Sequence, residues 1–213
     1  MNLVLIAVIA ANIIFSYKGF QDMAFFRRYE FHIGSIRAGD QIRMFSSAFL
    51  HADIVHLAFN MLTLYFFAPI VIDFMGTFSF VTVYFGSLAF SSLLTLYLPK
   101  NDYSYRAIGA SGAVTGVLYS AILLDPQMGV GLMFIPIPIP GYIFGVVYLL
   151  YSIYGMKAKN DNIGHAAHFG GAIGGYLITL AKEPHMFTDN TFFVIVLAIP
   201  IIVLFWMAKT GRI

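Results

Sequence analysis

Seven apolar segments are the feature that most constrains the fold of this 213-residue chain. They cover residues 2–17, 51–72, 78–98, 111–124, 141–156, 164–181 and 191–208. A helix needs roughly 20 apolar residues to cross about 30 Å of hydrocarbon, and most of the segments reach or approach that length. Only 10% of the residues are charged, against about a quarter in soluble domains. The sequence therefore predicts an all-α, polytopic transmembrane helix bundle.

Charge and cysteine content exclude several classes of function. The formal net charge is only +2 and gives no reason to expect nucleic acid as a partner. The chain has no cysteine, which rules out disulfides, thiolate catalysis and cysteine-ligated metals. The first apolar segment lacks a basic leader and a clear small-residue cleavage site, so we expect a retained span and not a signal peptide.

The fourth segment, residues 111–124, is too short to cross a bilayer alone. A helix there would begin below the membrane surface, which is tolerated only inside protein or beside a water-filled cavity. It opens with the run Gly109-Ala110-Ser111-Gly112. Free N–H groups and the positive dipole end at a helix start favour developing negative charge, and the glycines leave the hydroxyl uncovered. Ser111 therefore fits a nucleophile, although serine is equally common as a helix cap.

Two longer segments read as loops. Residues 18–50 mix basic and aromatic side chains, a composition suited to the membrane interface. Residues 125–140 contain Pro136, Pro138 and Pro140. Because proline removes backbone donors and favours extended geometry, we expect a loop there and not a span.

Four of the six histidines lie at the starts of apolar segments, as His51, His56, His165 and His168. His56 and Asn60 share one helix face. Both side chains donate hydrogen bonds, which suits the stabilisation of an oxyanion, although an interhelical hydrogen-bonded pair is the structural alternative. His168 has the chemistry of a general base for a serine hydroxyl, and His165 lies three residues away as its partner or as a polar residue of the same face.

Glycines four residues apart mark the fourth and sixth segments. Small residues at this spacing let membrane helices approach closely, and such packing would bring Ser111 near His168. A metal site is disfavoured, because no His-Glu-x-x-His run occurs and only Asp53 lies next to the clustered histidines. The glycines are Gly112 and Gly116 in the fourth segment and Gly170, Gly171, Gly174 and Gly175 in the sixth.

Three motifs in this order resemble the rhomboid family of intramembrane serine proteases, of bacterial type. They are His51-x-x-x-x-His56-x-x-x-Asn60, Gly109-Ala110-Ser111-Gly112 and Ala167-His168-x-x-Gly171-x-x-x-Gly175. Arg43 resembles the arginine of the family's Trp-Arg pair, with Ile42 in place of the tryptophan. Thr115 stands where an aromatic residue that packs on the catalytic imidazole is common. The resemblance covers residues 1–182.

The resemblance implies a role for each matching residue. Ser111 would be the nucleophile and His168 the general base of a two-residue dyad. His56, Asn60 and the backbone N–H of Ser111 would form the oxyanion hole. Glycines would shape the site and hold its helices together. The residues carried over in a structural role are Gly109, Gly112, Gly171, Gly175 and Arg43. The resemblance implies no metal and no cofactor.

The resemblance also implies an architecture and a location. Residues 1–182 would form a six-helix rhomboid-like protease core, and residues 183–213 a seventh transmembrane helix with a short tail. The family places its active site on the extracytoplasmic side, here of a bacterial inner (plasma) membrane. The positive-inside rule favours the opposite orientation, because every Lys and Arg except Lys182 lies in the first, third and fifth loops or the tail. We adopt the family orientation.

The resulting hypothesis is an intramembrane serine endopeptidase that cleaves transmembrane segments of other membrane proteins within the lipid bilayer. One alternative is a catalytically inactive rhomboid-like protein that binds client helices. A small transporter or channel is a second alternative, and it would need charged residues along a pathway. Asp53, Asp73 and Asp125 lie at or near segment ends, and the apolar segments carry no other acidic residue.

Overall fold

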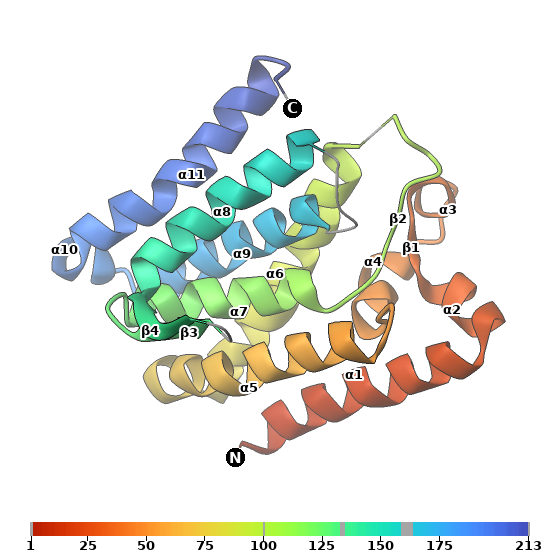
Figure 1. Cartoon of the computed structure of the whole chain (residues 1–213), viewed down its shortest axis with the longest axis horizontal. Helices are drawn as coiled ribbons and strands as arrows, with labels where there is room; N and C mark the ends of the chain where they lie inside the picture. The colour runs from red at the N-terminus through yellow and green to blue at the C-terminus, as the bar shows by residue number, and fades with distance from the viewer. Residues whose placement is uncertain (1, 100, 133–134, 159–163, 213) are drawn as a thin grey trace.

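The protein is a bundle of helices whose axes run side by side (Figure 1). The computed structural model describes residues 2–99, 101–132, 135–158 and 164–212. A helix covers each of the seven apolar segments, which confirms the predicted all-α polytopic bundle. These helices are α1 (Leu3–Gln21), α5 (Ile54–Met75), α6 (Thr77–Tyr97), α7 (Ser111–Leu124), α8 (Gly141–Ala158), α9 (His165–Lys182) and α11 (Thr191–Lys209).

Helix α7 occupies the centre of the bundle. All its residues from Gly112 to Leu123 are buried, and α5, α6 and α9 pack around it (Figure 1). Because protein surrounds this helix, its 14 residues need not match the thickness of a bilayer. Its first residue, Ser111, therefore lies inside the bundle and remains partly exposed.

Local signals fix the ends of α1, α5 and α6. The Asn2 side chain accepts hydrogen bonds from the first backbone N–H groups of α1. The Asp53 carboxylate accepts from the backbone N–H of His56 at 2.7 Å and so caps α5. Gly76 separates α5 from α6 with a φ of +81°, a conformation that a residue with a Cβ rarely adopts. This turn makes α5 and α6 antiparallel neighbours.

The segment between α1 and α5 folds into short elements held by Arg43. Arg43 is buried, and its guanidinium donates to the backbone carbonyls of Arg27 at 2.9 Å and Glu30 at 3.0 Å. Its Nε donates to the Asp40 carboxylate at 2.8 Å, and this hydrogen bond lowers the pKa of Asp40. The elements are α2 (Met23–Tyr29), β1 (Phe31–His32), α3 (Ile33–Arg37), α4 (Arg43–Ser46) and the 3-10 helix η1 (Ser47–Phe49); β1 pairs with β2 (Arg106–Ala107).

The proline-rich segment between α7 and α8 is extended, as the sequence predicts, but it also pairs with itself. Strands β3 (Gly129–Leu132) and β4 (Ile135–Pro140) form an antiparallel hairpin, with Val130 opposite Ile139. The pairing was not predicted, because prolines at alternate positions remove the donors on which a strand is usually recognised. Short helix α10 (Met186–Asp189) then links α9 to α11.

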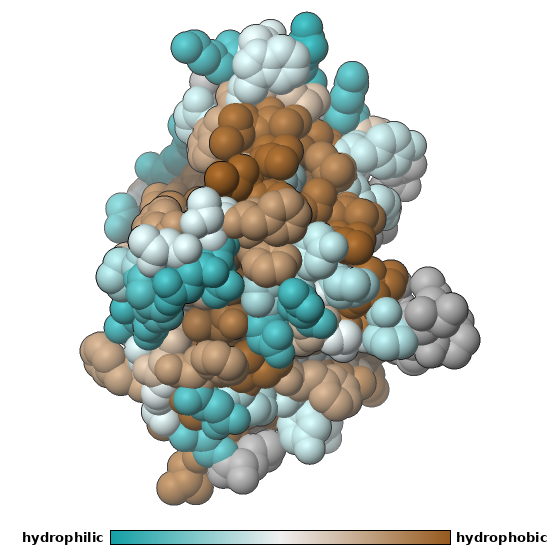
Figure 2. All heavy atoms as spheres, turned by 90° about the vertical axis from the view of Figure 1, so that its left-hand side faces the viewer, coloured by the Kyte–Doolittle hydropathy of each residue, from teal (hydrophilic) through white to brown (hydrophobic). Residues whose placement is uncertain are grey.

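The outer surface of the bundle is rich in large apolar side chains. Ile14 of α1, Phe66 of α5 and Ile202 of α11 are all exposed. Helices α1, α5, α6 and α11 are long and apolar enough to cross a membrane. Figure 2 shows the end of the bundle at the left of Figure 1, where hydrophilic side chains gather in patches between hydrophobic areas. The chain is therefore an integral membrane protein, with its apolar side chains facing lipid.

Candidate active site

A cavity of about 1220 Å³ brings together the four polar residues singled out in the sequence. Ser111, His168, His56 and Asn60 all line it. Helices α5, α7 and α9 run in the same direction, so their first turns lie at the same end of the bundle (Figure 1). Helix α8, strand β3 and the segment 105–108 also line it. This volume is somewhat above the roughly 300–1,000 Å³ of most ligand-binding pockets.

Gly109 leaves open the space between His56 and Ser111. Its φ is +114°, which favours glycine over any residue with a side chain. A Cβ on Gly109 would lie 2.8 Å from Nε2 of His56 and 3.8 Å from Oγ of Ser111. The imidazole edge and the hydroxyl therefore face one small volume, and any larger residue at position 109 would fill it.

The hydrogen bond at Nδ1 of His56 leaves Nε2 of the same ring able to donate. Nδ1 of His56 accepts from the backbone N–H of Ala52 at 3.4 Å. In the neutral imidazole the proton then resides on Nε2, the nitrogen that faces the space beside Ser111. Asn60 is buried and gives one amide proton to the carbonyl of His56 at 3.1 Å. Its second amide proton is a further donor.

His51, the first histidine of its motif, lies behind the cavity and supports the backbone that precedes Ser111. The Ser16 hydroxyl donates to the carbonyl of Phe49 at 2.9 Å, so it accepts from Nδ1–H of His51 at 2.7 Å. Nε2 of His51 is then an acceptor, and the backbone N–H of Ala110 points to it at 3.4 Å. A buried chain of hydrogen bonds thus joins α1 to the start of α7.

Glycines give α7 and α9 an unusually close contact. A Cβ on Gly171 would overlap the backbone carbonyl of Gly112, and one on Gly175 would overlap that of Gly116. A Cβ on Gly112 would in turn lie 3.1 Å from the carbonyl oxygen of Ala167. With no side chains between them, the two helices meet backbone to backbone. This contact places the first turn of α9, which carries His168, beside the first turn of α7.

The imidazole of His168 is held by Tyr148 of α8, a residue that the sequence did not single out. Nδ1 of His168 lies 2.9 Å from the Tyr148 hydroxyl. The two rings stack, with centroids 6.0 Å apart and planes 20° apart. The Tyr148 hydroxyl also lies 3.4 Å from the Thr115 hydroxyl. An aromatic residue therefore packs on His168 even though position 115 carries threonine.

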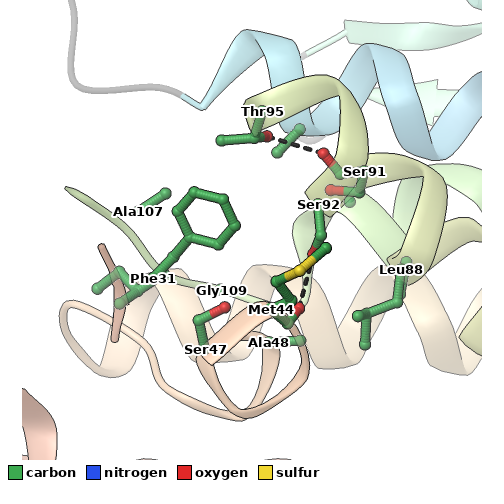
Figure 3. Close-up of a pocket in the computed structure, with 14 residues that line it drawn as sticks. Phe31, Met44, Ser47, Ala48, Leu88, Ser91, Ser92, Thr95, Ala107 and Gly109 are labelled. Carbon is green, nitrogen blue, oxygen red and sulfur yellow. Dashed lines mark hydrogen bonds between the residues drawn. The ribbon is translucent and has the colours of Figure 1, made fainter. Parts of the chain in front are cut away.

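A second, much smaller cavity of about 30 Å³ lies behind the run Gly109–Gly112. Serine and threonine side chains line it (Figure 3). Thr95 donates to the carbonyl of Ser91 at 2.8 Å, and Ser92 donates to the carbonyl of Met44 at 2.6 Å. A Cβ on Gly112 would overlap the Ser91 side chain. Its volume corresponds to about one or two water molecules; no sequence motif marks this cavity, because its polar residues come from separate elements.

The described part of the chain contains no recognisable metal-binding group. No group of three or more His, Asp or Glu side chains there is arranged to hold a metal ion. The charged residues nearest the cavity are Asp53, which caps α5, and Arg106. The chemistry available at this site is therefore that of a hydroxyl, imidazoles and amide donors.

Comparison with known proteins identifies the family. The rhomboid domain model matches residues 38–184, more than half of the chain. The chain belongs to the rhomboid family. It is 30% identical over 140 residues to Rhomboid protein 1, mitochondrial, of Saccharomyces cerevisiae. The matched region is 64% of this chain and 40% of the yeast protein. It is also 28% identical over 187 residues to RHOMBOID-like protein 12, mitochondrial, of Arabidopsis thaliana. That matched region is 80% of this chain and 55% of the plant protein.

A bacterial protein is similar to this rhomboid as well. YdcA of Bacillus subtilis, which is described as a candidate rhomboid protease, is 30% identical over 143 residues, covering 66% of this chain and 67% of YdcA. The chain spans about half the length of the mitochondrial relatives it matches. The family resemblance seen in the sequence is thereby confirmed, whereas a bacterial type is not, since the relatives include both mitochondrial and bacterial proteins.

Proposed function

We propose that this rhomboid is an intramembrane serine endopeptidase that cleaves transmembrane segments of membrane proteins through a dyad of Ser111 and His168. The observation that carries the proposal is the single cavity shared by Ser111, His168, His56 and Asn60. It unites a hydroxyl, a base and two side-chain donors inside a bundle that faces lipid. This combination is the minimum for acyl transfer by a serine.

In the proposed first step, Ser111 Oγ attacks the carbonyl carbon of the scissile peptide and its proton passes to Nε2 of His168. The carbonyl oxygen becomes an oxyanion. In this proposal, Nε2–H of His56, the second amide proton of Asn60 and the backbone N–H of Ser111 stabilise it. Preorganised donors of this kind are typically the largest electrostatic contribution to such catalysis.

In the second half of the reaction the tetrahedral intermediate collapses. The carbon–nitrogen bond breaks, and the leaving amine takes the proton from His168. Water then attacks the acyl group on Ser111 while His168 accepts a proton from it. The acyl–oxygen bond breaks, Ser111 regains its hydroxyl proton, and the new carboxylate leaves. No metal or cofactor enters either half of this scheme.

The walls of the cavity suit an apolar peptide as substrate. Phe59, Phe66 and Phe67 line it from α5, and Phe144 lines it from α8. An unwound peptide needs donors and acceptors for its backbone, which membrane lipid does not supply. A polar centre with aromatic walls therefore favours a transmembrane segment whose helix has opened locally.

The proposal extends to the architecture and the location. Residues 1–182 would form the protease core, and residues 183–213 would add the seventh helix and tail. We place the cavity on the extracytoplasmic side of the membrane, as the family resemblance implies. Cysteine substitution of exposed Ser104, which lies in the loop before α7, followed by labelling with an impermeant maleimide, tests this orientation.

Cleavage of a model transmembrane substrate in proteoliposomes tests the function. The wild-type protein should cleave it, whereas Ser111→Ala and His168→Ala should not. Ser104→Ala, a change at an exposed loop position, is the matched control and should cleave normally. Binding of the substrate without cleavage by the wild type would instead support the inactive, client-binding alternative.

A further inference from the structure

We propose that Tyr148 of α8, together with Thr115 of α7, is the positioning unit that holds His168 in the tautomer required of a general base. The inference rests on the proposed dyad. Its starting observation is the 2.9 Å contact between the Tyr148 hydroxyl and Nδ1 of His168, combined with stacking of the two rings. Tyr148 is a positioning residue, because it acts on His168 and not on the substrate.

The direction of this hydrogen bond follows from the chemistry. A base that takes the Ser111 proton at Nε2 needs a lone pair there, so its own proton must sit on Nδ1. Nδ1–H then donates, and the Tyr148 oxygen accepts. If the phenol donated instead, the proton would sit on Nε2, and the imidazole would present a protonated nitrogen with no free lone pair to Ser111. The tautomer of His168 therefore depends on where the Tyr148 proton points.

Thr115 supplies a destination for that proton. The hydroxyl of Thr115, on α7, lies 3.4 Å from the Tyr148 hydroxyl. When the phenol donates to Thr115, its oxygen lone pairs remain available to Nδ1–H of His168. Phe144, one helical turn earlier on α8, stacks on Tyr148 with ring centroids 5.8 Å apart and planes 13° apart. The phenol is thus fixed both in position and in orientation.

The contact should strengthen during the reaction. Once His168 has taken the Ser111 proton it is an imidazolium, and its bond to the Tyr148 oxygen becomes charge-assisted. An interaction that is stronger with the charged intermediate than with the resting enzyme raises kcat without tightening substrate binding. Tyr148 would thereby perform, with a neutral oxygen, the orienting task that a carboxylate performs in a Ser-His-Asp triad.

The first test compares Tyr148→Phe with Tyr154→Phe, the same change at an exposed position of the same helix. Tyr148→Phe keeps the stacked ring and loses only the oxygen. We expect its kcat and its rate of labelling by a fluorophosphonate probe to fall on the order of 10- to 100-fold, with KM and melting temperature unchanged. Tyr154→Phe should match the wild type in all four quantities.

The second test separates the hydrogen bond from packing. Thr115→Val keeps the shape of threonine but removes the hydroxyl, whereas Thr115→Ser keeps the hydroxyl and removes a methyl group. The proposal expects Thr115→Val to lose activity and Thr115→Ser to retain it. A site that needs only a well-packed residue at position 115 would give the opposite order and would overturn the proposal.

The outcomes distinguish this inference from the function on which it rests. A wild-type protein that neither cleaves the substrate nor reacts with the probe contradicts the dyad itself. An active wild type with a Tyr148→Phe variant of equal kcat contradicts the positioning role alone. A Tyr148→Phe variant that loses activity only through a higher KM or a lower melting temperature also contradicts it.

Discussion

Replacing Gly171 by alanine should separate the two helices that carry the proposed dyad. The added Cβ would overlap the backbone carbonyl oxygen of Gly112. That oxygen belongs to the first turn of α7 and cannot turn aside without breaking a helical hydrogen bond. The overlap is therefore relieved only if α9 moves away from α7, by roughly 1–2 Å if ordinary van der Waals separation is to be regained.

The expected magnitude has a structural and a catalytic part. Overpacking of a tight contact typically costs about 1–3 kcal/mol, and alanine regains about 0.5–1 kcal/mol over glycine inside a helix. The net loss of stability should therefore be small, about 1–2 kcal/mol. The loss of rate should be larger, because a displacement of about 1 Å at a catalytic group can cost about 10²-fold.

Gly145→Ala is the matched control, since it is the same substitution at a buried position of a neighbouring helix. A Cβ on Gly145 would meet only side-chain atoms, at 3.1 Å from Leu197 and 3.3 Å from Tyr119. We expect Gly145→Ala to melt and to cleave nearly as the wild type does. The assay measures kcat and the melting temperature of both variants in the same detergent. A Gly171→Ala variant with wild-type kcat would refute the claim that this contact sets the distance within the dyad.

Three further predictions follow from the hydrogen bonds around the site. His56→Ala and Asn60→Ala should each lower kcat by about 10²–10³-fold in the cleavage assay, with little change in substrate affinity. Ser16→Ala should slow probe labelling by about 5-fold and lower the melting temperature, because it leaves the ring N–H of a buried histidine without its acceptor. Arg43 lowers the pKa of Asp40 below its ordinary value of 3.8, so the stabilisation that Asp40 provides is present above that value and is lost as the pH falls through the lowered pKa. In thermal melts between pH 2 and pH 6, Asp40→Asn should lack this acid-dependent loss.

The fold was largely predictable because its main determinant is local. Each helix that crosses the bundle is a continuous apolar run, and its cost of insertion depends on the residues of that run alone. The structure of the segments between the helices was harder to predict. The β3–β4 hairpin depends on pairing between residues such as Val130 and Ile139, and the alternate prolines conceal that pairing in the sequence.

The candidate site was predictable where its residues follow a motif and not where they come from separate helices. Ser111, His168, His56 and Asn60 were selected in the sequence and line one cavity in the structure, although their catalytic roles remain predictions. Tyr148 was missed, since nothing in an apolar helix marks which tyrosine faces a histidine 20 residues away.

The sequence also showed no sign of the contact between Ser16 of α1 and His51, which supports the backbone before Ser111, and the reason is the same. Ser16 lies 35 residues before His51, and their contact exists only because α1 packs along the start of α5. A single serine in an apolar helix gives no signal of such a contact. Side-chain hydrogen bonds between distant helices depend on the packed structure, which the apolar pattern determines only in outline.

The most direct test of the central claim is to locate the covalent adduct of a fluorophosphonate probe by mass spectrometry of the purified protein in detergent. If Ser111 and His168 form the dyad, Ser111 alone should be modified, and His168→Ala should carry no modification. A stable, folded wild-type protein that is unmodified, or that carries the adduct on another serine, would contradict a mechanism based on Ser111.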